Sequence, residues 1–247
     1  MAPHPVIANA YEGPENKRHF VDSIFNATAG DYDRVERFLS FGTGRKYRVR
    51  ALARAGLKSG MRVIDVGVGT GLVASGAKSI VGDASLVIGV DPSSEMRRHA
   101  HAQLGIQVCS GTAESIPFED ASFDFLSMGY ALRHITDLNA AFREFYRVLR
   151  PSENHRGGHL CILEMTRPRT RIGRFLLRSH FGLCLQAIRV SHSVEPRTPE
   201  LWRYYWETID ACISPAQVMQ ALSIAGFVDV KRHIVGGIFS EYTARRR

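Results

Sequence analysis

Short apolar runs alternate with amphipathic stretches through the middle of the chain. The stretches Leu72–Ile80, Ser94–Leu104 and Asp137–Leu149 have the spacing of helices. Apolar runs typical of buried strands lie around them, at Arg62–Val66, Leu86–Val90, Ile106–Ser110, Phe123–Met128 and His159–Glu164. Strands that alternate with helices predict an α/β fold with a doubly wound, mostly parallel sheet.

The N-terminal part of the chain has a different pattern. Between Glu15 and Ala55, charged residues interleave with apolar residues at the spacing of amphipathic helices. Glycine weakens a helix, and we therefore predict helix breaks near Gly30 and Gly42. This segment is expected to form a helical lead-in to the sheet.

The C-terminal part predicts one more helix and two strands. Ser214–Gln217 combines an N-cap serine, a proline at the first helical position and a capping-box glutamine, and Gly226 ends the helix. Phe227–His233 and Ile234–Thr243 follow as strands with two glycines near their junction. We therefore expect seven strands, the last two forming an antiparallel pair at the edge.

Composition excludes several classes of protein. With 247 residues, of which 45% are hydrophobic and 23% charged, the chain is neither disordered nor fibrous. Its four cysteines lie far apart, in neither disulfide-framework nor zinc-site spacing (Cys109, Cys161, Cys184 and Cys212). We therefore expect reduced thiols and no metal.

The net charge of +8 is compatible with nucleic acid, an anionic membrane surface or an acidic substrate, and it does not choose among them. The N-terminus lacks the basic and apolar regions of a signal peptide, and no apolar stretch is long enough to span a bilayer. The expected location is the cytoplasm.

A glycine-rich turn follows the first predicted strand. Gly67, Gly69 and Gly71 lie where the backbone must approach a ligand closely and enter a helix. A dinucleotide-binding turn has the pattern G-x-G-x-x-G, and its third glycine would fall at position 72, which is Leu72 here. The pattern in this chain is G-x-G-x-G instead. A P-loop lysine with its hydroxyl neighbour is also missing from the turn. The turn therefore argues against NAD, FAD and nucleoside triphosphates.

Asp91 suggests which ligand the turn binds. It ends the second strand roughly 20 residues beyond the turn, where a carboxylate can accept both hydroxyls of a ribose. A ribose without a pyrophosphate signature points to S-adenosylmethionine.

Further motifs extend along most of the chain. They are Gly111–Phe118, Ser122–Phe125, Ala131–Asp137, Tyr146–Pro151, the N-terminal Phe25–Asp33 with Leu39–Gly42, and the C-terminal Tyr204–Ile209 with Gly236-Gly237. Together they resemble the class I S-adenosylmethionine-dependent methyltransferases, and more narrowly the UbiE-type C-methyltransferases of ubiquinone and menaquinone biosynthesis. The resemblance covers about residues 20 to 243.

The resemblance implies a fold and an activity. The fold is a Rossmann-like class I methyltransferase fold, with residues 1–55 as a helical cap of the same domain. Residues 56–247 form the methyltransferase domain, with a basic lid insertion at about 166–206. The activity is methyl transfer from S-adenosylmethionine to carbon of a quinol-like or phenolic ring. Two alternatives stay open: a specialised-metabolite C-, N- or O-methyltransferase, and a non-catalytic cofactor-binding scaffold of a biosynthetic complex.

The cofactor-binding residues follow from the same motifs. The methionine part is expected at Asp65, Gly67, Gly69, Thr70 and Gly71, the ribose at Asp91, and the adenine at Thr112 and Ala113. Ser127 and Gly129 are expected to line the cleft at the carboxyl end of the fourth strand, where α/β sheets bind ligands. The simpler alternatives are that Asp65 caps the turn and that Asp91 caps the following helix.

Arg133 and His134 are the catalytic candidates, because they come just after the fourth strand. A phenol has a pKa near 10, so a nearby base or cation that favours the phenolate would activate the ring carbon. The alternative is a structural pair that bonds loop carbonyls. In the resembling family an asparagine is usual where this chain has His134, and a serine where it has Gly129. Transfer from a sulfonium needs no metal.

The segment Arg167–Arg178 mixes cations with apolar residues at helical spacing. It is interpreted either as a helix on an anionic bilayer, from which a prenylated quinol is drawn, or as a lid over the acceptor pocket. Nucleic acid is not expected, because the aromatic residues are not interleaved as a stacking platform. The expected partner is a small aromatic acceptor, which can be lipophilic. Peripheral membrane contact, a homodimer and a biosynthetic complex are left open.

Overall fold

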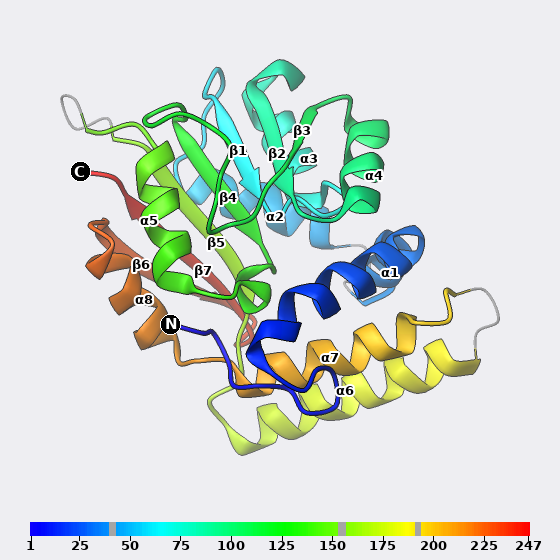
Figure 1. Cartoon of the computed structure of the whole chain (residues 1–247). Coiled ribbons are helices and arrows are strands. Elements are labelled where there is room, and N and C mark those ends of the chain that lie inside the picture. The colour runs from blue at the N-terminus through cyan, green and yellow to red at the C-terminus, as the bar shows by residue number, and fades with distance from the viewer. Residues whose placement is uncertain (40–42, 153–156, 191–193) are drawn as a thin grey trace.

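A seven-stranded sheet forms the centre of the computed structural model, which describes residues 1–39, 43–152, 157–190 and 194–247 (Figure 1). The strand order is β3-β2-β1-β4-β5-β7-β6. The strands are β1 (Val63–Val66), β2 (Val87–Asp91), β3 (Gln107–Ser110), β4 (Phe125–Gly129), β5 (His159–Met165), β6 (Val228–Val235) and β7 (Phe239–Arg245). The first five strands are parallel, and β7 runs antiparallel to both β5 and β6. The predicted sheet and its antiparallel C-terminal pair are confirmed.

Helices cover both faces of this sheet. They are α1 (Lys17–Leu39), α2 (Gly44–Arg54), α3 (Leu72–Val81), α4 (Ser94–Leu104), α5 (Leu138–Val148), α6 (Arg171–Val190), α7 (Thr198–Ala211) and α8 (Pro215–Ile224). Short 3₁₀ turns lie at Pro14–Asn16, Ala84–Leu86 and Leu132–His134. The predicted capping box at Ser214 is present, and Asp137 accepts the Asn139 amide at 2.9 Å as the N-cap of α5.

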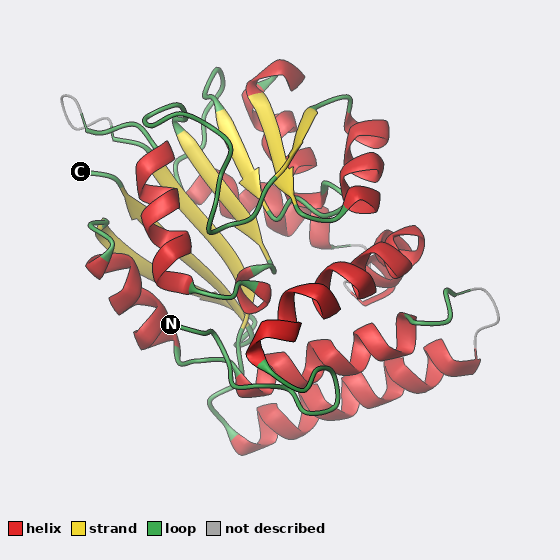
Figure 2. Ribbon diagram, in the orientation of Figure 1, coloured by secondary structure: helices red, strands yellow, loops and turns green. Residues whose placement is uncertain are grey.

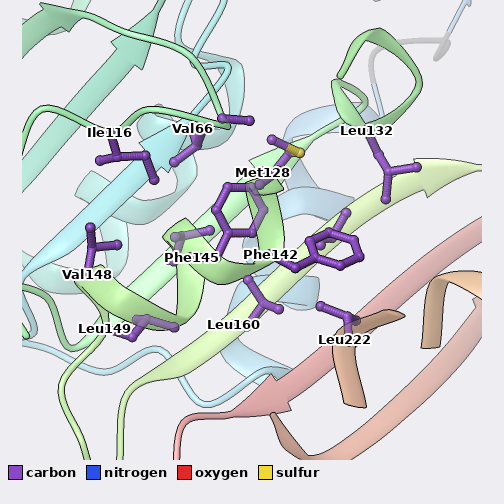
Figure 3. Close-up of a cluster of buried hydrophobic side chains, with 14 of the residues drawn as sticks. Val66, Ile116, Met128, Leu132, Phe142, Phe145, Val148, Leu149, Leu160 and Leu222 are labelled. Atoms are coloured by element: carbon purple, nitrogen blue, oxygen red, sulfur yellow. The ribbon is translucent and has the colours of Figure 1, made fainter. Parts of the chain in front are cut away.

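The core is divided between the two faces because strand side chains alternate. Ile64, Leu126 and Leu160 belong to the cluster on the side of α5 and α8. Figure 3 shows Leu160 beside the rings of Phe142 and Phe145. The alternate positions, Val63, Val87, Phe125 and Cys161, face α2 and α3. Each fully buried large apolar side chain contributes roughly 1.5–3 kcal/mol. Burial on both faces explains why the strands read as continuous apolar runs.

A third helical layer lies beyond the carboxyl ends of the central strands. It consists of α1, α6 and α7, which lie side by side (Figure 2). Phe20, Ile24 and Tyr204 join α1 to α7, and Phe181 stacks on Trp202 between α6 and α7. The ends of the strands that carry the candidate site therefore face this layer.

Three expectations about elements need correction or qualification. The break near Gly30 is wrong, because α1 runs through it; the helix is packed against α4 and α7, and packing outweighs the cost of about 1 kcal/mol for one glycine. The last strand begins at Phe239 rather than Ile234, because Gly236 and Gly237 take positive φ and form the turn. The break near Gly42 lies outside the described residues.

The basic insertion expected at about 166–206 is occupied by α6 and α7, and α7 continues to Ala211. Among the described residues, no helix is both long enough and apolar enough to cross a bilayer.

Candidate functional site

The glycine turn joins β1 to α3 and has free space beside its middle glycine. Gly67, Gly69 and Gly71 all have positive φ, which side-chain-bearing residues rarely adopt. A Cβ added at Gly69 would meet no atom within 4 Å, so the middle of the turn faces free space. The amides of all three glycines are bonded within the protein, to the oxygens of Val90 and Val68 and to the Asp91 carboxylate. That a ligand binds in the free space beside Gly69 stays a prediction.

Asp91 is tied to this turn. One of its carboxylate oxygens accepts the Gly69 amide at 2.9 Å, and the other accepts the Ser93 amide at 2.9 Å. Burial raises the pKa of Asp91 to about 6, against the opposing effect of these two hydrogen bonds. A carboxylate oxygen has two lone pairs, so each oxygen can still accept one hydroxyl hydrogen.

Asp65 carries an unsatisfied oxygen beside the turn. It pairs in register with Ser127 of β4, whose hydroxyl donates to Oδ1 at 2.7 Å. Its Oδ2 is buried and has no hydrogen-bond partner among the described residues. Burial raises the pKa of this carboxyl to about 7. The Ser127 hydroxyl and the Ala74 amide of α3 oppose this rise. A buried, incompletely paired carboxyl fits a ligand that brings a charged amino group.

Three other predicted residues are used by the protein itself. The Thr70 hydroxyl donates to Asp33 of α1, so α1 lies across the glycine turn. Thr112 exchanges backbone hydrogen bonds with Ser115, both 3.2 Å, just beyond the end of β3. Ala113 is buried in the core on the α5 side. A role for these residues toward adenine or methionine stays a prediction.

Gly129, at the end of β4, is crowded on one side. A Cβ there would lie 2.3 Å from Cγ2 of Val73 in α3. Val73 therefore takes the space that a serine side chain would need, and Gly129 offers only its backbone to the cleft.

A large, mostly apolar cavity adjoins the turn. Its volume is about 830 Å³, and it lies between the end of the sheet and the layer of α1, α6 and α7. Leu177 and Phe181 from α6 and Trp202 from α7 form part of its wall. This volume is within the range of about 300–1,000 Å³ of small-molecule sites.

Three side chains border both this cavity and a crevice of about 30 Å³ along the glycine turn. They are Tyr32, Arg48 and Tyr130. Arg48 is buried, pairs with Glu36 at 2.7 Å and lies over the Tyr130 ring at 5.5 Å from its centroid. These three side chains therefore lie between the glycine turn and the wide cavity.

Arg133 lines the wide cavity. Its guanidinium forms an ion pair with Glu164 of β5 at 3.3 Å, and 3% and 1% of the two side chains are exposed. Nε of Arg133 and Oε2 of Glu164 have no hydrogen-bond partner among the described residues, and Nη1 has only the ion pair with Glu164. Burial raises the pKa of Glu164, and Arg133 opposes that rise. Within the described structure, the Nε–H group of the guanidinium is therefore left without a partner.

His134 lies apart from the wall of the cavity. Its ring packs against the rings of Phe25, Tyr204 and Tyr205, and Nδ1 lies 3.3 Å from the Tyr204 hydroxyl. Burial, together with nearby cations led by Arg133, holds its pKa well below the usual value. The imidazole is therefore neutral at physiological pH. Its catalytic role stays a prediction.

Sequence reasoning did not single out Glu164, Arg48 or Tyr130. The sequence position of Glu164 could have indicated it. It lies near the carboxyl end of β5, where α/β sheets bind ligands, and β5 pairs with β4, the strand that precedes Arg133. Arg48 carries no such signal, since α2 reaches the site only through tertiary packing.

No group of three or more His, Cys, Asp or Glu side chains able to hold a metal occurs in the described part of the chain. That transfer proceeds without a metal stays a prediction.

Comparison with known protein families identifies a family to which this chain is similar. The model of the ubiE/COQ5 methyltransferase family matches residues 13–245. A demethylmenaquinone methyltransferase of Roseiflexus castenholzii is 30% identical over 231 residues, covering 92% of this chain and 93% of that protein. A ubiquinone/menaquinone biosynthesis C-methyltransferase UbiE of Pseudoalteromonas translucida is 28% identical, covering 90% and 89%.

Solved structures are similar at lower identity. An S-adenosylmethionine-dependent methyltransferase of Thermotoga maritima, described as a possible histamine N-methyltransferase, has a TM-score of 0.63 at 23% identity, covering 91% of this chain and 99% of that one. Phosphoethanolamine N-methyltransferase 2 of Haemonchus contortus, in complex with S-adenosylmethionine, has a TM-score of 0.58 at 18% identity, covering 81% and 52%. These likenesses show the fold and confirm the predicted Rossmann-like class I arrangement.

Proposed function

Because the chain belongs to the ubiE/COQ5 methyltransferase family, we propose that it transfers a methyl group from S-adenosylmethionine to a ring carbon of a quinol-like acceptor in quinone biosynthesis. The observation that carries this proposal is the extent of the match, residues 13–245. It includes α1, α6 and α7, which line the wide cavity, as well as the cofactor half. The family match does not favour the specialised-metabolite methyltransferase or the non-catalytic scaffold.

The donor site is assigned to the edge formed by β1, β2 and β4. The unsatisfied Oδ2 of Asp65 suits the amino group of the methionine part, and the two oxygens of Asp91 suit the ribose hydroxyls. Gly67, Gly69 and Gly71 supply backbone, and the remaining contacts are assigned to Thr70, Thr112, Ala113, Ser127 and Gly129. When bound, S-adenosylmethionine supplies an electrophilic methyl group.

Arg133 is the proposed catalytic residue. A cation beside a phenol favours the phenolate, which raises the electron density of the ring. We assign the unpartnered Nε–H of Arg133 to the acceptor oxygen in the wide cavity, while Glu164 holds the guanidinium through Nη1. We assign a positioning role to His134. Its neutral ring lies against Tyr204 and holds the loop that carries Arg133. The apolar walls exclude water from the transfer.

The acceptor is proposed to be lipophilic. The wide cavity is lined mainly by apolar and aromatic groups and is large enough for a ring with a hydrocarbon side chain. Such an acceptor partitions into bilayers, so we also propose that the protein contacts a membrane peripherally. A homodimer or biosynthetic complex is compatible with this function but is not needed for it.

The direct test is an assay of the purified chain with S-adenosylmethionine and a demethylated quinol that carries a short prenyl chain. The expected product has a new carbon–methyl bond, identified by NMR, and S-adenosylhomocysteine forms in equal amount. An O-methylated product, or no product although both ligands bind, would overturn the proposal. Arg133→Gln serves as the low-activity control.

A further inference from the structure

The outward face of α6 is unusually apolar. Nine large hydrophobic side chains are exposed in the described part of the chain, and five of them are on this one helix. They are Ile172, Phe175, Leu176, Leu183 and Val190, with exposed fractions between 61% and 76%. Because an α-helix has 3.6 residues per turn, their spacing places all five on one side. We call these five residues the apolar face of α6.

The opposite side of α6 already provides its packing. Leu177, Phe181, Cys184 and Ile188 are buried against α7, where Phe181 also accepts the Trp202 indole N–H at its backbone oxygen, 3.0 Å away. The helix is therefore held in the fold without its outer side. A helix that is apolar on both sides is usually covered on both sides, so the apolar face calls for a partner.

Charge indicates what the partner is. Between Met165 and Val194 the chain has six arginines and no aspartate or glutamate. The helical arginines, Arg171, Arg174, Arg178 and Arg189, fall on one flank of the apolar face by the same helical spacing. Of the six, only Arg167 has a carboxylate partner within the described ranges, Asp210 at 3.8 Å. The partner must therefore be apolar in its middle and negative at its edge.

We propose that α6 docks on an anionic phospholipid bilayer. In this mode a helix lies in the plane of the headgroups with its apolar side about 5–10 Å deep, while arginines meet the lipid phosphates. A second copy of the chain fits less well. In a two-fold contact the same face meets itself, and α6 of the second copy has no aspartate or glutamate to offer the arginine flank.

The bilayer contact would also serve the site. Gly173, Leu176 and Leu177 of α6 line the wide cavity, as do Arg167–Thr170 just before the helix. A bilayer on the outer side of α6 therefore lies next to the cavity, a short path for a lipophilic acceptor. This last step rests on the proposed function, whereas the docking surface does not.

The test is flotation of the full chain with vesicles of phosphatidylcholine mixed with phosphatidylglycerol, and with vesicles of phosphatidylcholine alone. The variant is Phe175→Ser/Leu183→Ser, since neither side chain lines the cavity. The matched control is Ile224→Ser on α8, which removes a side chain that is 74% exposed, away from the face. We expect the wild type and Ile224→Ser to float with the mixed vesicles, less so at high salt. The double variant should bind at least about tenfold more weakly.

Three results would overturn the docking proposal. They are no flotation of the wild type, an equal loss in Ile224→Ser, or a dimer that the double variant converts to monomer without any vesicle binding. The last would make the face an interface between copies. Turnover of a water-soluble demethylquinol tests the proposed methyl transfer independently of the docking surface. Equal turnover by the double variant, with vesicle binding lost, supports the docking surface, whereas a wild type that floats but methylates no quinol refutes the proposed function alone.

Discussion

The carboxylate of Glu164 lies 3.3 Å from the guanidinium of Arg133, and both side chains are almost completely excluded from water. A buried ion pair gains little net stability, because desolvation offsets the attraction. The pair is better explained by position. It fixes a cation at the wall of the cavity, with Nη1 held by Glu164 and Nε left without a partner in the described structure.

Glu164→Gln is expected to lower kcat about tenfold to hundredfold and to leave the affinity for S-adenosylmethionine unchanged, because the carboxylate acts only through Arg133. The matched control is Glu241→Gln, which removes another buried carboxylate from a pair, with Arg54 at 2.6 Å. Steady-state kinetics of Glu164→Gln, Arg133→Gln and the double variant should be strongly non-additive. Additive losses would mean that the two residues act separately.

Asp91→Ala is expected to abolish detectable binding of S-adenosylmethionine, since the change removes the ribose acceptor and the support of the Gly69 amide. Calorimetric titration measures this directly. Asp83→Ala is the control, because Asp83 caps a nearby turn by accepting the Ser85 amide. NADH should bind to neither variant nor the wild type. Unchanged affinity in Asp91→Ala would assign Asp91 to helix capping alone.

The affinity for S-adenosylmethionine is expected to rise with pH between about 5 and 8. Burial raises the pKa of Asp91 to about 6 and that of Asp65 to about 7, so the free protein holds protons that cationic and hydroxyl donors of the ligand displace. Each carboxyl adds at most about tenfold per pH unit below its pKa. Titrations in buffers of different ionisation enthalpy should report proton release. Asp65→Asn should flatten the upper part of the profile.

The raised pKa values of Asp65 and Asp91 also determine how the free energy of unfolding changes with pH. A carboxyl whose pKa is raised on folding binds more protons in the folded state, so its contribution to the free energy of unfolding falls as pH rises. For Asp65 this window runs from its ordinary value of 3.8 to about 7. A ligand-free protein that became more stable across that window, with Asp65→Asn showing the same rise, would contradict the assignment.

Gly129→Ser is expected to destabilise the fold by about 1–3 kcal/mol, because the new Cβ would lie 2.3 Å from Val73. Thermal or urea unfolding measures the loss. The double variant Gly129→Ser/Val73→Ala should recover part of it, because alanine vacates the space. Val73→Ala alone is the control for the cavity that the shorter side chain leaves. A tolerated Gly129→Ser would show that α3 can shift here.

Periodicity predicted the sheet because its strands are buried on both faces and its turns carry glycine and capping residues. The same local reasoning was wrong at Gly30, where contacts of α1 with α4 and α7 outweigh helix propensity. The placement of Asp65 and Asp91 near each other was predictable, since they lie at or next to the carboxyl ends of neighbouring strands. The wide cavity was not, because Arg48, Tyr130 and Trp202 come from separate elements that only tertiary packing brings together.

The crevice and the wide cavity share three side chains, Tyr32, Arg48 and Tyr130. A molecule that occupied both spaces would have to pass between these side chains. An inhibitor that links an adenosyl group to a quinol ring has to thread its linker past two phenol rings and a guanidinium. A short, flat, electron-rich linker suits that passage, because arginine is attracted to the faces of π systems. Tethering the two halves raises the effective concentration of the second, so such a bivalent ligand gains affinity over either half.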